Sequence, residues 1–263
     1  IAVLPDAPVD PWGLVSLKKI MTFASAITLL QLLSVELARV MGHRHGAILT
    51  GLLGGFISST ATVLTLARAS KHPNAHAGSL FLTYIASTIA MQLVCIGILF
   101  LNTQELHYPT LLIMLLPVLS GVIGLVLEAN GSSKLPARAP QVKFEWDHVL
   151  KLVALIVLTL VASKMSQAYF QESGTMLVTF VVSLFEMHGS VIASLQLHDA
   201  GAIDLQLLGA LLSITVFASF TSKLFFVVFL GGAELKSKVV KYTALSYTLL
   251  AIGWVVFTVL ALP

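Results

Sequence analysis

The stretch GAILTGLLGGFISSTATVLTLA, residues 46–67, decides how this chain folds, because a second stretch of the same kind follows it. Residues 174–195 read GTMLVTFVVSLFEMHGSVIASL, and the two align without a gap at an offset of 128 residues (174 − 46 = 128). The alignment pairs Ser58 with Glu186, Thr60 with His188 and Thr62 with Ser190. A duplicated apolar segment with polar groups at its middle is typical of the core of a transporter or channel.

The composition places the chain in a membrane. Of its 263 residues, 57% are hydrophobic and 10% are charged, against about 25% charged residues in soluble domains, and the mean hydropathy is +0.95. We expect an all-α, polytopic protein of the bacterial inner membrane, surrounded by the lipid bilayer. The net charge of +3 gives no reason to expect a nucleic acid partner, and we expect no cofactor. The single cysteine, Cys95, excludes an intrachain disulfide and a thiol cluster for metal.

Eight apolar stretches are long enough to cross a bilayer, which needs about 20 residues. They cover residues 17–41, 46–70, 77–102, 108–129, 148–171, 174–198, 203–231 and 238–262. The polar stretch that begins at Asn130 separates two halves of four segments each, and we interpret residues 1–130 and 131–263 as two membrane repeats. Four spans in each half would give parallel repeats, whereas one re-entrant segment in each half would give inverted repeats. The sequence leaves both arrangements open.

Basic residues of the loops favour one orientation if all eight segments span. One side of the membrane then collects Lys18, Lys19, Arg68, Lys71, Lys134, Arg138, Lys143 and Lys151. The other side collects Arg39, Arg44, Lys236, Lys238 and Lys241. The side with more basic residues is expected to be cytoplasmic.

Polar side chains recur every four residues in the third and seventh segments. At an offset of 131, which needs three extra residues, Tyr84 pairs with Thr215, Thr88 with Ser219 and Gln92 with Lys223. Residues four apart lie on one face of a helix, so each set predicts a polar stripe that faces the protein interior. For the hydroxyl side chains, the alternative interpretation is ordinary packing between membrane helices.

Glu186 and Lys223 are harder to explain by packing, because a charge deep in a membrane helix costs roughly 2.5–3.5 kcal/mol on insertion scales. They form either a buried ion pair that fixes the packing or part of an ion or proton site. His188 lies two residues after Glu186, on the opposite face of an unbroken helix. A shared site therefore requires the helix to break. We expect breaks near Gly54–Thr60 and Glu186–Gly189.

The residues from Leu4 (LPD, then PWG), together with the stretch from Gly42 to Arg68, resemble the uncharacterised C-terminal membrane domain of bacterial MgtC/SapB-type proteins. The matching residues are Gly54, Gly55, Ser58, Ser59, Thr60, Ala61, Thr62 and Arg68. The resemblance implies magnesium-related transport and an MgtC-like segment before Ile1. In the second copy that family shows an Asp-x-Asp motif, where this chain has Glu186 and His188, which departs from a pair of carboxylates for a divalent cation. Lys223 matches a lysine that the family often carries late in the next helix.

We therefore expect a transporter or channel-like protein for a small ion or polar solute, with its site at the repeat interface. The candidate site residues are Ser58, Ser59, Thr60, Thr62, Gln92, Glu186, His188, Ser190 and Lys223. In this hypothesis Glu186 carries the charge or proton, His188 tunes it and Lys223 is the counter-charge.

Two alternatives stay open. One is a membrane scaffold or regulatory protein whose polar centre only specifies helix packing. The other is an intramembrane enzyme that uses Glu186, His188 and a serine, although no known catalytic motif is present. The sequence also leaves open a homo-oligomer, and it does not identify a metal. Two histidine pairs at membrane boundaries, His43 with His45 and His72 with His76, are weak candidates for metal binding.

Overall fold

The computed structural model describes residues 7–8, 10, 13–41, 46–102, 108–129 and 147–260, and every structural statement below refers to them. These residues form eight helices and no strand. The helices are α1 (Leu17–Met41), α2 (Ala47–Ala69), α3 (Ala77–Asn102), α4 (Tyr108–Ala129), α5 (Asp147–Ser183), α6 (Met187–Asp199), α7 (Leu205–Leu230) and α8 (Ala233–Leu260). The expected boundary at residue 130 lies outside the described residues, as do His43, Arg44, His45, Lys134, Arg138 and Lys143.

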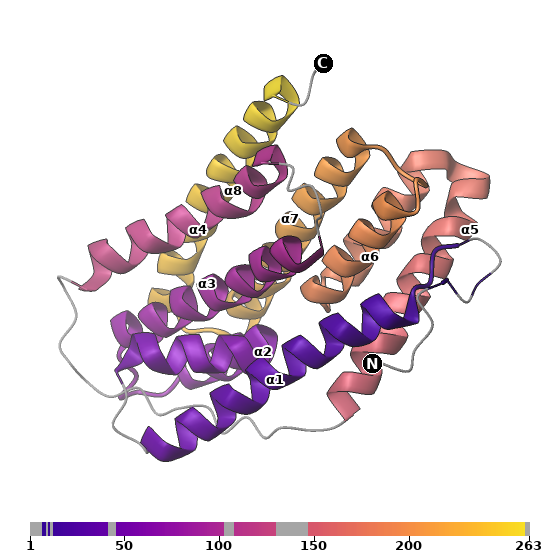
Figure 1. Cartoon of the computed structure of the whole chain (residues 1–263). Helices are drawn as coiled ribbons and strands as arrows, with labels where there is room; N and C mark the ends of the chain where they lie inside the picture. The colour runs from indigo at the N-terminus through magenta and orange to yellow at the C-terminus, as the bar shows by residue number, and fades with distance from the viewer. Residues whose placement is uncertain are drawn as a thin grey trace.

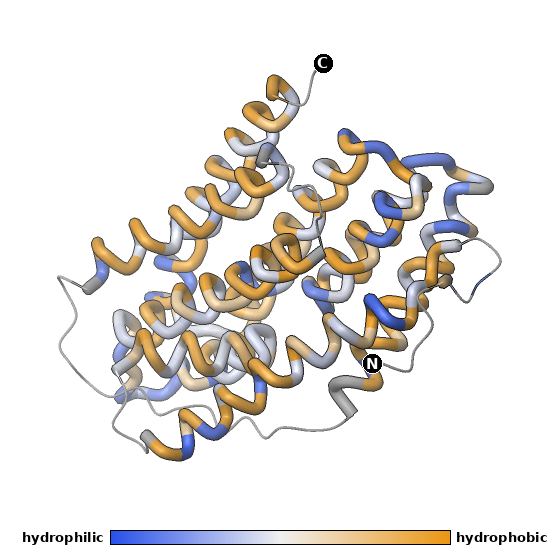
Figure 2. The backbone as a smooth tube through the Cα atoms, in the orientation of Figure 1, coloured by the Kyte–Doolittle hydropathy of each residue, from blue (hydrophilic) through white to orange (hydrophobic). Residues whose placement is uncertain are grey.

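Length and hydropathy make this a multi-pass membrane protein. Seven of the described helices hold an apolar stretch long enough to cross a bilayer, and α6, with 13 residues, is too short. Hydrophobic residues predominate along nearly every helix (Figure 2). On the outer surface Leu33, Phe100 and Val255 are 60%, 56% and 58% exposed. An apolar surface of this extent is suited to contact with lipid tails.

α3 is the central helix of the bundle (Figure 1), and it contacts α2, α4, α6 and α8. In its membrane-spanning stretch 78% of the residues are buried, against 22–56% in the other six spans. Tyr84, Ile85, Met91 and Leu99 of α3 are almost fully buried. A polar side chain on this helix therefore faces protein rather than lipid.

The first half of α2 runs beside α3 in the same direction. Gly51 lies against Thr83, and Gly55, four residues later, lies against Ser87, also four residues later. Small residues at this spacing allow two membrane helices to approach closely. Both contacts move four residues toward the C-terminus together, so the two helices are parallel here. The first half of α2 therefore enters the membrane from the end at which α3 begins.

The second half of α2 turns back toward the start of α3. A straight continuation past Ser58 would carry Ala69 about 24 residues beyond Ala77 along α3, roughly 36 Å at about 1.5 Å per residue. The link of residues 70–76 reaches at most about 29 Å when fully extended. Backbone hydrogen bonds, among them Lys71 N–H to Arg68 O (3.3 Å), fold this link into turns instead. α2 is therefore re-entrant, because it enters the membrane and leaves on the same side.

The end of α5 and the whole of α6 form a second element of this kind. Ser183, the last residue of α5, donates from its Oγ to Thr215 Oγ1 (3.2 Å), ten residues or about 15 Å into α7. Only residues 200–204 join Asp199, the end of α6, to Leu205, the start of α7. α6 therefore returns from the middle of α7 to the end of the molecule at which α7 begins.

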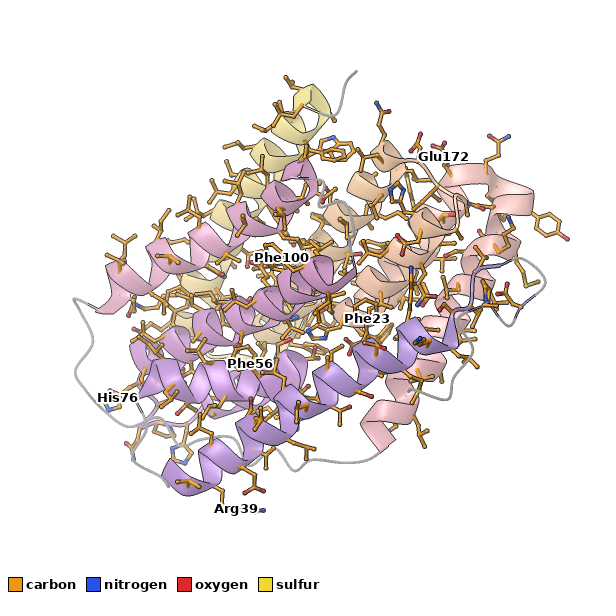
Figure 3. All side chains as sticks on the ribbon, in the orientation of Figure 1. Phe23, Arg39, Phe56, His76, Phe100 and Glu172 are labelled. Carbon is orange, nitrogen blue, oxygen red and sulfur yellow. The ribbon has the colours of Figure 1, made fainter. Side chains whose placement is uncertain are left out.

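The two re-entrant elements enter from opposite ends of the molecule. α5 bends at Gln171, which has a φ of 54°, and its last arm follows this bend. Figure 3 shows Glu172, the first residue of that arm, at the end where α6 runs into α7. Arg39 and His76, which lie beside α2, are at the opposite end of the same view.

This arrangement differs from the expectation of eight spans in two segments. The expected second and sixth segments do not cross the bilayer as single helices, because each reverses about half-way. The sixth segment is also divided between α5 and α6, with a break before Met187. One extended residue is enough to reverse a helix, and hydropathy does not register such a residue.

Candidate functional site

Both re-entrant elements break at a single residue with an extended backbone. Ser58 has φ −166° and ψ 103°, and Glu186 has φ −144° and ψ 109°. Ser58 Oγ accepts the N–H of Ala61 (3.3 Å), and Glu186 Oε1 accepts the N–H of His188 (3.0 Å). Each side chain thus caps the arm that follows it. The two breaks expected from the sequence are confirmed at these residues.

The break at Glu186 brings its carboxylate against the ring of His188. Glu186 Oε1 lies 2.8 Å from His188 Nδ1, an ion pair when the imidazole is protonated. The Glu186 side chain is 33% exposed and that of His188 is 14% exposed, so the pair is accessible from outside the protein. The second ring nitrogen of His188, Nε2, is buried and has no hydrogen-bond partner in the described part of the chain.

We call residues 58–60 the first tip and residues 186–188 the second tip. At each tip a helix begins inside the membrane, so free backbone N–H groups give the tip a partial positive charge. Glu186 opposes that charge at the second tip, whereas the first tip has only hydroxyl side chains. Of these, Ser59 is buried and Thr60 is half-buried. The first tip thus favours an anion or a polar group, and the second tip favours a cation or a proton.

The remaining candidates on the two re-entrant elements are both fully buried. Thr62 is 0% exposed, and its Oγ1 has no hydrogen-bond partner among the described residues. Ser190 is also 0% exposed, and its Oγ donates to the backbone carbonyl of Glu186 (3.1 Å). Ser190 therefore stabilises the second tip through its backbone, while Thr62 retains an unused hydroxyl.

Lys223 is buried in α7 without a direct ion pair. It is 1% exposed, and its Nζ donates to Ser219 Oγ (2.8 Å). No described carboxylate oxygen lies within 4.0 Å of this ammonium group, so the ion pair with Glu186 considered from the sequence is absent.

The polar stripes of α3 and α7 face the interior, as their four-residue spacing predicts. The six residues Tyr84, Thr88, Gln92, Thr215, Ser219 and Lys223 are each at most 2% exposed. The two helices meet where Ser219 Oγ donates to Met91 Sδ (3.3 Å). Gln92 is unusual in this setting, because neither its Nε2 nor its Oε1 has a hydrogen-bond partner among the described residues.

Sequence reasoning missed a polar cluster between α3, α4 and α8. Thr88 Oγ1 lies 3.0 Å from the hydroxyl of Tyr242, and Ser120 Oγ lies 2.7 Å from Ser246 Oγ. Ser246 Oγ also donates to the carbonyl of Tyr242 (3.0 Å). Tyr242 and Ser246 are four residues apart and so lie on one face of α8, which is the sequence pattern that could have indicated this cluster.

The arrangement of the site residues bears on a metal site and on a catalytic pair. The described residues contain no group of three or more His, Cys, Asp and Glu side chains that could hold a metal ion. Ser190 donates to a backbone carbonyl, and His188 meets Glu186. No hydrogen bond between a serine hydroxyl and His188 occurs in the described part of the chain, so a nucleophile–base pair is not formed there.

Comparison with known proteins finds one matching family model. The family model described as Domain of unknown function (DUF4010) matches residues 26–231, which is 206 of the 263 residues (231 − 26 + 1 = 206). No curated protein and no solved structure matches the chain.

Proposed function

We propose that this chain, which belongs to the DUF4010 family, transports a small ion or polar solute. The description of the family names no activity, so the proposal is argued from the geometry of the site. The proposed path passes between the first and second tips. The single observation that carries this proposal is the pair of helix breaks at Ser58 and Glu186, 128 residues apart (186 − 58 = 128), in elements that enter from opposite ends.

This geometry supports two inverted repeats, with residues 1–130 as the first and 131–263 as the second. α3 and α7 each have 26 residues, and their first residues are 128 apart (205 − 77 = 128). The offset of the breaks therefore extends to these helices without the three extra residues assumed from the sequence. It pairs Lys223 with Cys95 instead of Gln92 (223 − 128 = 95).

Opposed directions of α3 and α7 support the inversion. The two helices meet near their middles through Met91 and Ser219. Gly232, just after the end of α7, donates its N–H to Ser70 Oγ (2.8 Å), which precedes the start of α3. Inverted repeats with broken helices at the midplane are the architecture of many secondary transporters, in which one repeat rocks against the other around a central site.

Buried polar atoms without partners favour transport over a scaffold. A centre that served only packing would satisfy its hydrogen-bonding groups, because each unsatisfied buried group costs about 1–3 kcal/mol. Both amide atoms of Gln92, Nε2 of His188 and Oγ1 of Thr62 lack partners among the described residues. A polar solute or hydrated ion that passes the tips would supply them.

The candidate residues divide the work in this proposal, and Ser190 supports the second tip through the Glu186 carbonyl. Glu186 carries the coupled charge or proton, and His188 holds its carboxylate in place through Nδ1. Lys223, which forms no direct ion pair with Glu186, is the counter-charge. Hydroxyl ligands come from Ser58, Ser59, Thr60 and Thr62, and Gln92 provides an amide.

The test is a transport assay on the purified protein in liposomes. Currents on a solid-supported membrane are recorded after concentration jumps of Na⁺, K⁺, Mg²⁺, chloride, phosphate and neutral amino acids, and a pH dye inside the vesicles reports proton movement. We expect a saturable signal for at least one solute above that of protein-free liposomes. If none of these solutes gives a signal with folded protein, the transport proposal fails and the scaffold is favoured.

A further inference from the structure

An apolar cavity of about 230 Å³ lies between α1, α2 and α3. The first half of α2 approaches the first tip from one end of the molecule, and the cavity lies beyond the tip, toward the opposite end. Its walls are Phe23, Ala26, Ile27, Leu30, Phe56, Leu93, Val94, Gly97, Ile98 and Leu101. All ten residues are apolar, so the cavity offers no hydrogen bond to a polar solute from a side chain. It is therefore separate in chemistry from the site between the tips.

The cavity follows directly from the re-entrant path of α2. Because α2 reverses at Ser58, it fills only half of the membrane thickness between α1 and α3. Phe56, two residues before the reversal, forms one wall of the cavity. The other walls come from the first part of α1 and the last part of α3, which lie beyond the reversal.

The cavity opens to the lipid-facing surface. Leu93 and Leu101, both in its wall, are 44% and 65% exposed. Both side chains belong to the membrane-spanning stretch of α3, so their exposed surface faces lipid tails. The opening belongs to the leaflet in which α1 begins and α3 ends.

We propose that this cavity binds one acyl chain of a membrane lipid from that leaflet. Apolar cavities of about 150 Å³ stay dry and bind small hydrocarbons. The apolar side chains of this cavity likewise offer water no hydrogen-bond partner, so we expect it to hold hydrocarbon. Hydrocarbon chains of the surrounding bilayer are the apolar groups present at this depth, and the opening leads to them. The bound chain packs against Phe56 and supports the first tip from behind.

Gly97 provides a clean way to fill the cavity. A Cβ atom built on Gly97 meets no atom within 4 Å, so a larger side chain enters the space without a clash near the backbone. Gly97→Leu and Gly97→Phe form a graded pair of variants. Ala251→Phe adds an aromatic ring at an exposed position of α8 that does not line the cavity, and it is the matched control.

The experiment uses the full chain in nanodiscs of phosphatidylethanolamine in which one lipid in ten carries a photoactivatable acyl chain. After irradiation, mass spectrometry maps the lipid adducts. In the wild type we expect adducts on residues 23–30 and 93–101 to exceed those on the exposed residues of α8 several-fold. Gly97→Phe should lower them by at least fivefold, Gly97→Leu by less, and Ala251→Phe should leave them unchanged.

Either of two results would overturn the proposal. One is wild-type labelling of α1 and α3 at or below the level on α8. The other is unchanged labelling in both Gly97 variants, each shown to be folded by size-exclusion profile and melting temperature. Because the readout is lipid labelling, the result is independent of whether the protein transports a solute.

Discussion

Glu186 accepts a hydrogen bond at its carboxylate oxygen Oε1 from the backbone N–H of His188 (3.0 Å), and the same oxygen lies 2.8 Å from the ring nitrogen Nδ1 of His188. Two residues at this separation face away from one another in an unbroken helix. The contact exists because α6 begins at Met187 and Glu186 is its extended N-cap. The helix break is therefore what creates the ionisable centre, and the predictions below test the break, its surroundings and its charge.

The cap of the first tip should contribute measurably to stability. Ser58→Ala removes the hydroxyl that accepts the Ala61 N–H, and we expect a loss of about 1 kcal/mol in the free energy of unfolding. Ser58→Asn restores an acceptor and should recover most of that loss. Thermal unfolding of the two variants in detergent measures the difference. Equal melting temperatures for wild type and Ser58→Ala would show that the cap is not formed.

Close packing of α2 on α3 should depend on Gly55. A Cβ atom at this position would lie 2.5 Å from the Ser87 carbonyl oxygen and 2.7 Å from its Cα, so backbone must move. We expect Gly55→Ala to destabilise the protein by about 1–3 kcal/mol through overpacking. Gly97→Ala, where the new atom meets nothing within 4 Å, is the control and should be neutral or stabilising. A loss of stability in Gly55→Ala no larger than that in the control would contradict the close packing.

Removal of the Lys223 ammonium should not destabilise the fold. Its hydrogen bonds go to Ser219, and no carboxylate is left unpaired when it is lost. Lys223→Met has a similar shape and avoids burial of a charge, so we expect unchanged or higher stability. Lys241→Met, at an exposed position, is the control. A loss of about 3–5 kcal/mol in Lys223→Met would instead indicate a broken buried ion pair with Glu186.

The re-entrant path of α2 predicts which loops share a side of the membrane. A cysteine placed at Val40 and one at Lys71 should react with a membrane-impermeant maleimide from the same side, and one at Ser173 from the opposite side. The native Cys95 is buried and gives a low background. Labelling of the Val40 and Lys71 positions from opposite sides would show that α2 crosses the membrane.

This path also changes the expected orientation. With α2 re-entrant, the end of the molecule that holds the α2–α3 link collects Arg39, Arg68, Lys71, Lys236, Lys238 and Lys241, and the opposite end of α1 holds Lys18 and Lys19. The positive-inside rule then predicts that the first of these ends is cytoplasmic. Compared with the orientation inferred from eight spans, Lys18, Lys19 and Arg39 change sides, whereas the α2–α3 link with Arg68 and Lys71 stays cytoplasmic. The same maleimide experiment, carried out on intact cells, determines which end is outside.

The helical membrane fold and the two breaks could be predicted from the sequence, because apolar runs and the glycines beside Ser58 and Glu186 are local signals. The reversal at each break could not, since it depends on how residues 47–57 pack against α3. The hydrogen-bond partner of Lys223 could not be predicted from the sequence either. Ser219 lies four residues before it on the same helix, but the choice between Ser219 and Glu186 depends on the distance between α6 and α7.

The positions of the two helix breaks were predicted correctly, whereas the helix bounds favour another register between α3 and α7 than the one inferred from the sequence. Ser58 and Glu186 have the same backbone conformation at the expected offset of 128. In α3 and α7 the resemblance of polar stripes favoured 131, whereas the helix bounds favour 128. Stripes with a four-residue period look alike after a shift of three or four residues, so residue type alone does not determine their register.

The most direct test of the account is solute-driven current in Glu186→Gln. Glutamine keeps the shape of the side chain and can still accept the His188 N–H, so the fold should persist while the ionisation is lost. Glu36→Gln is the matched control, because Glu36 is exposed on α1 and pairs with Arg39 outside the site. We expect liposomes with Glu186→Gln to give no current above protein-free liposomes, and those with Glu36→Gln to match wild type. Wild-type current in folded Glu186→Gln would contradict the central role of this carboxylate.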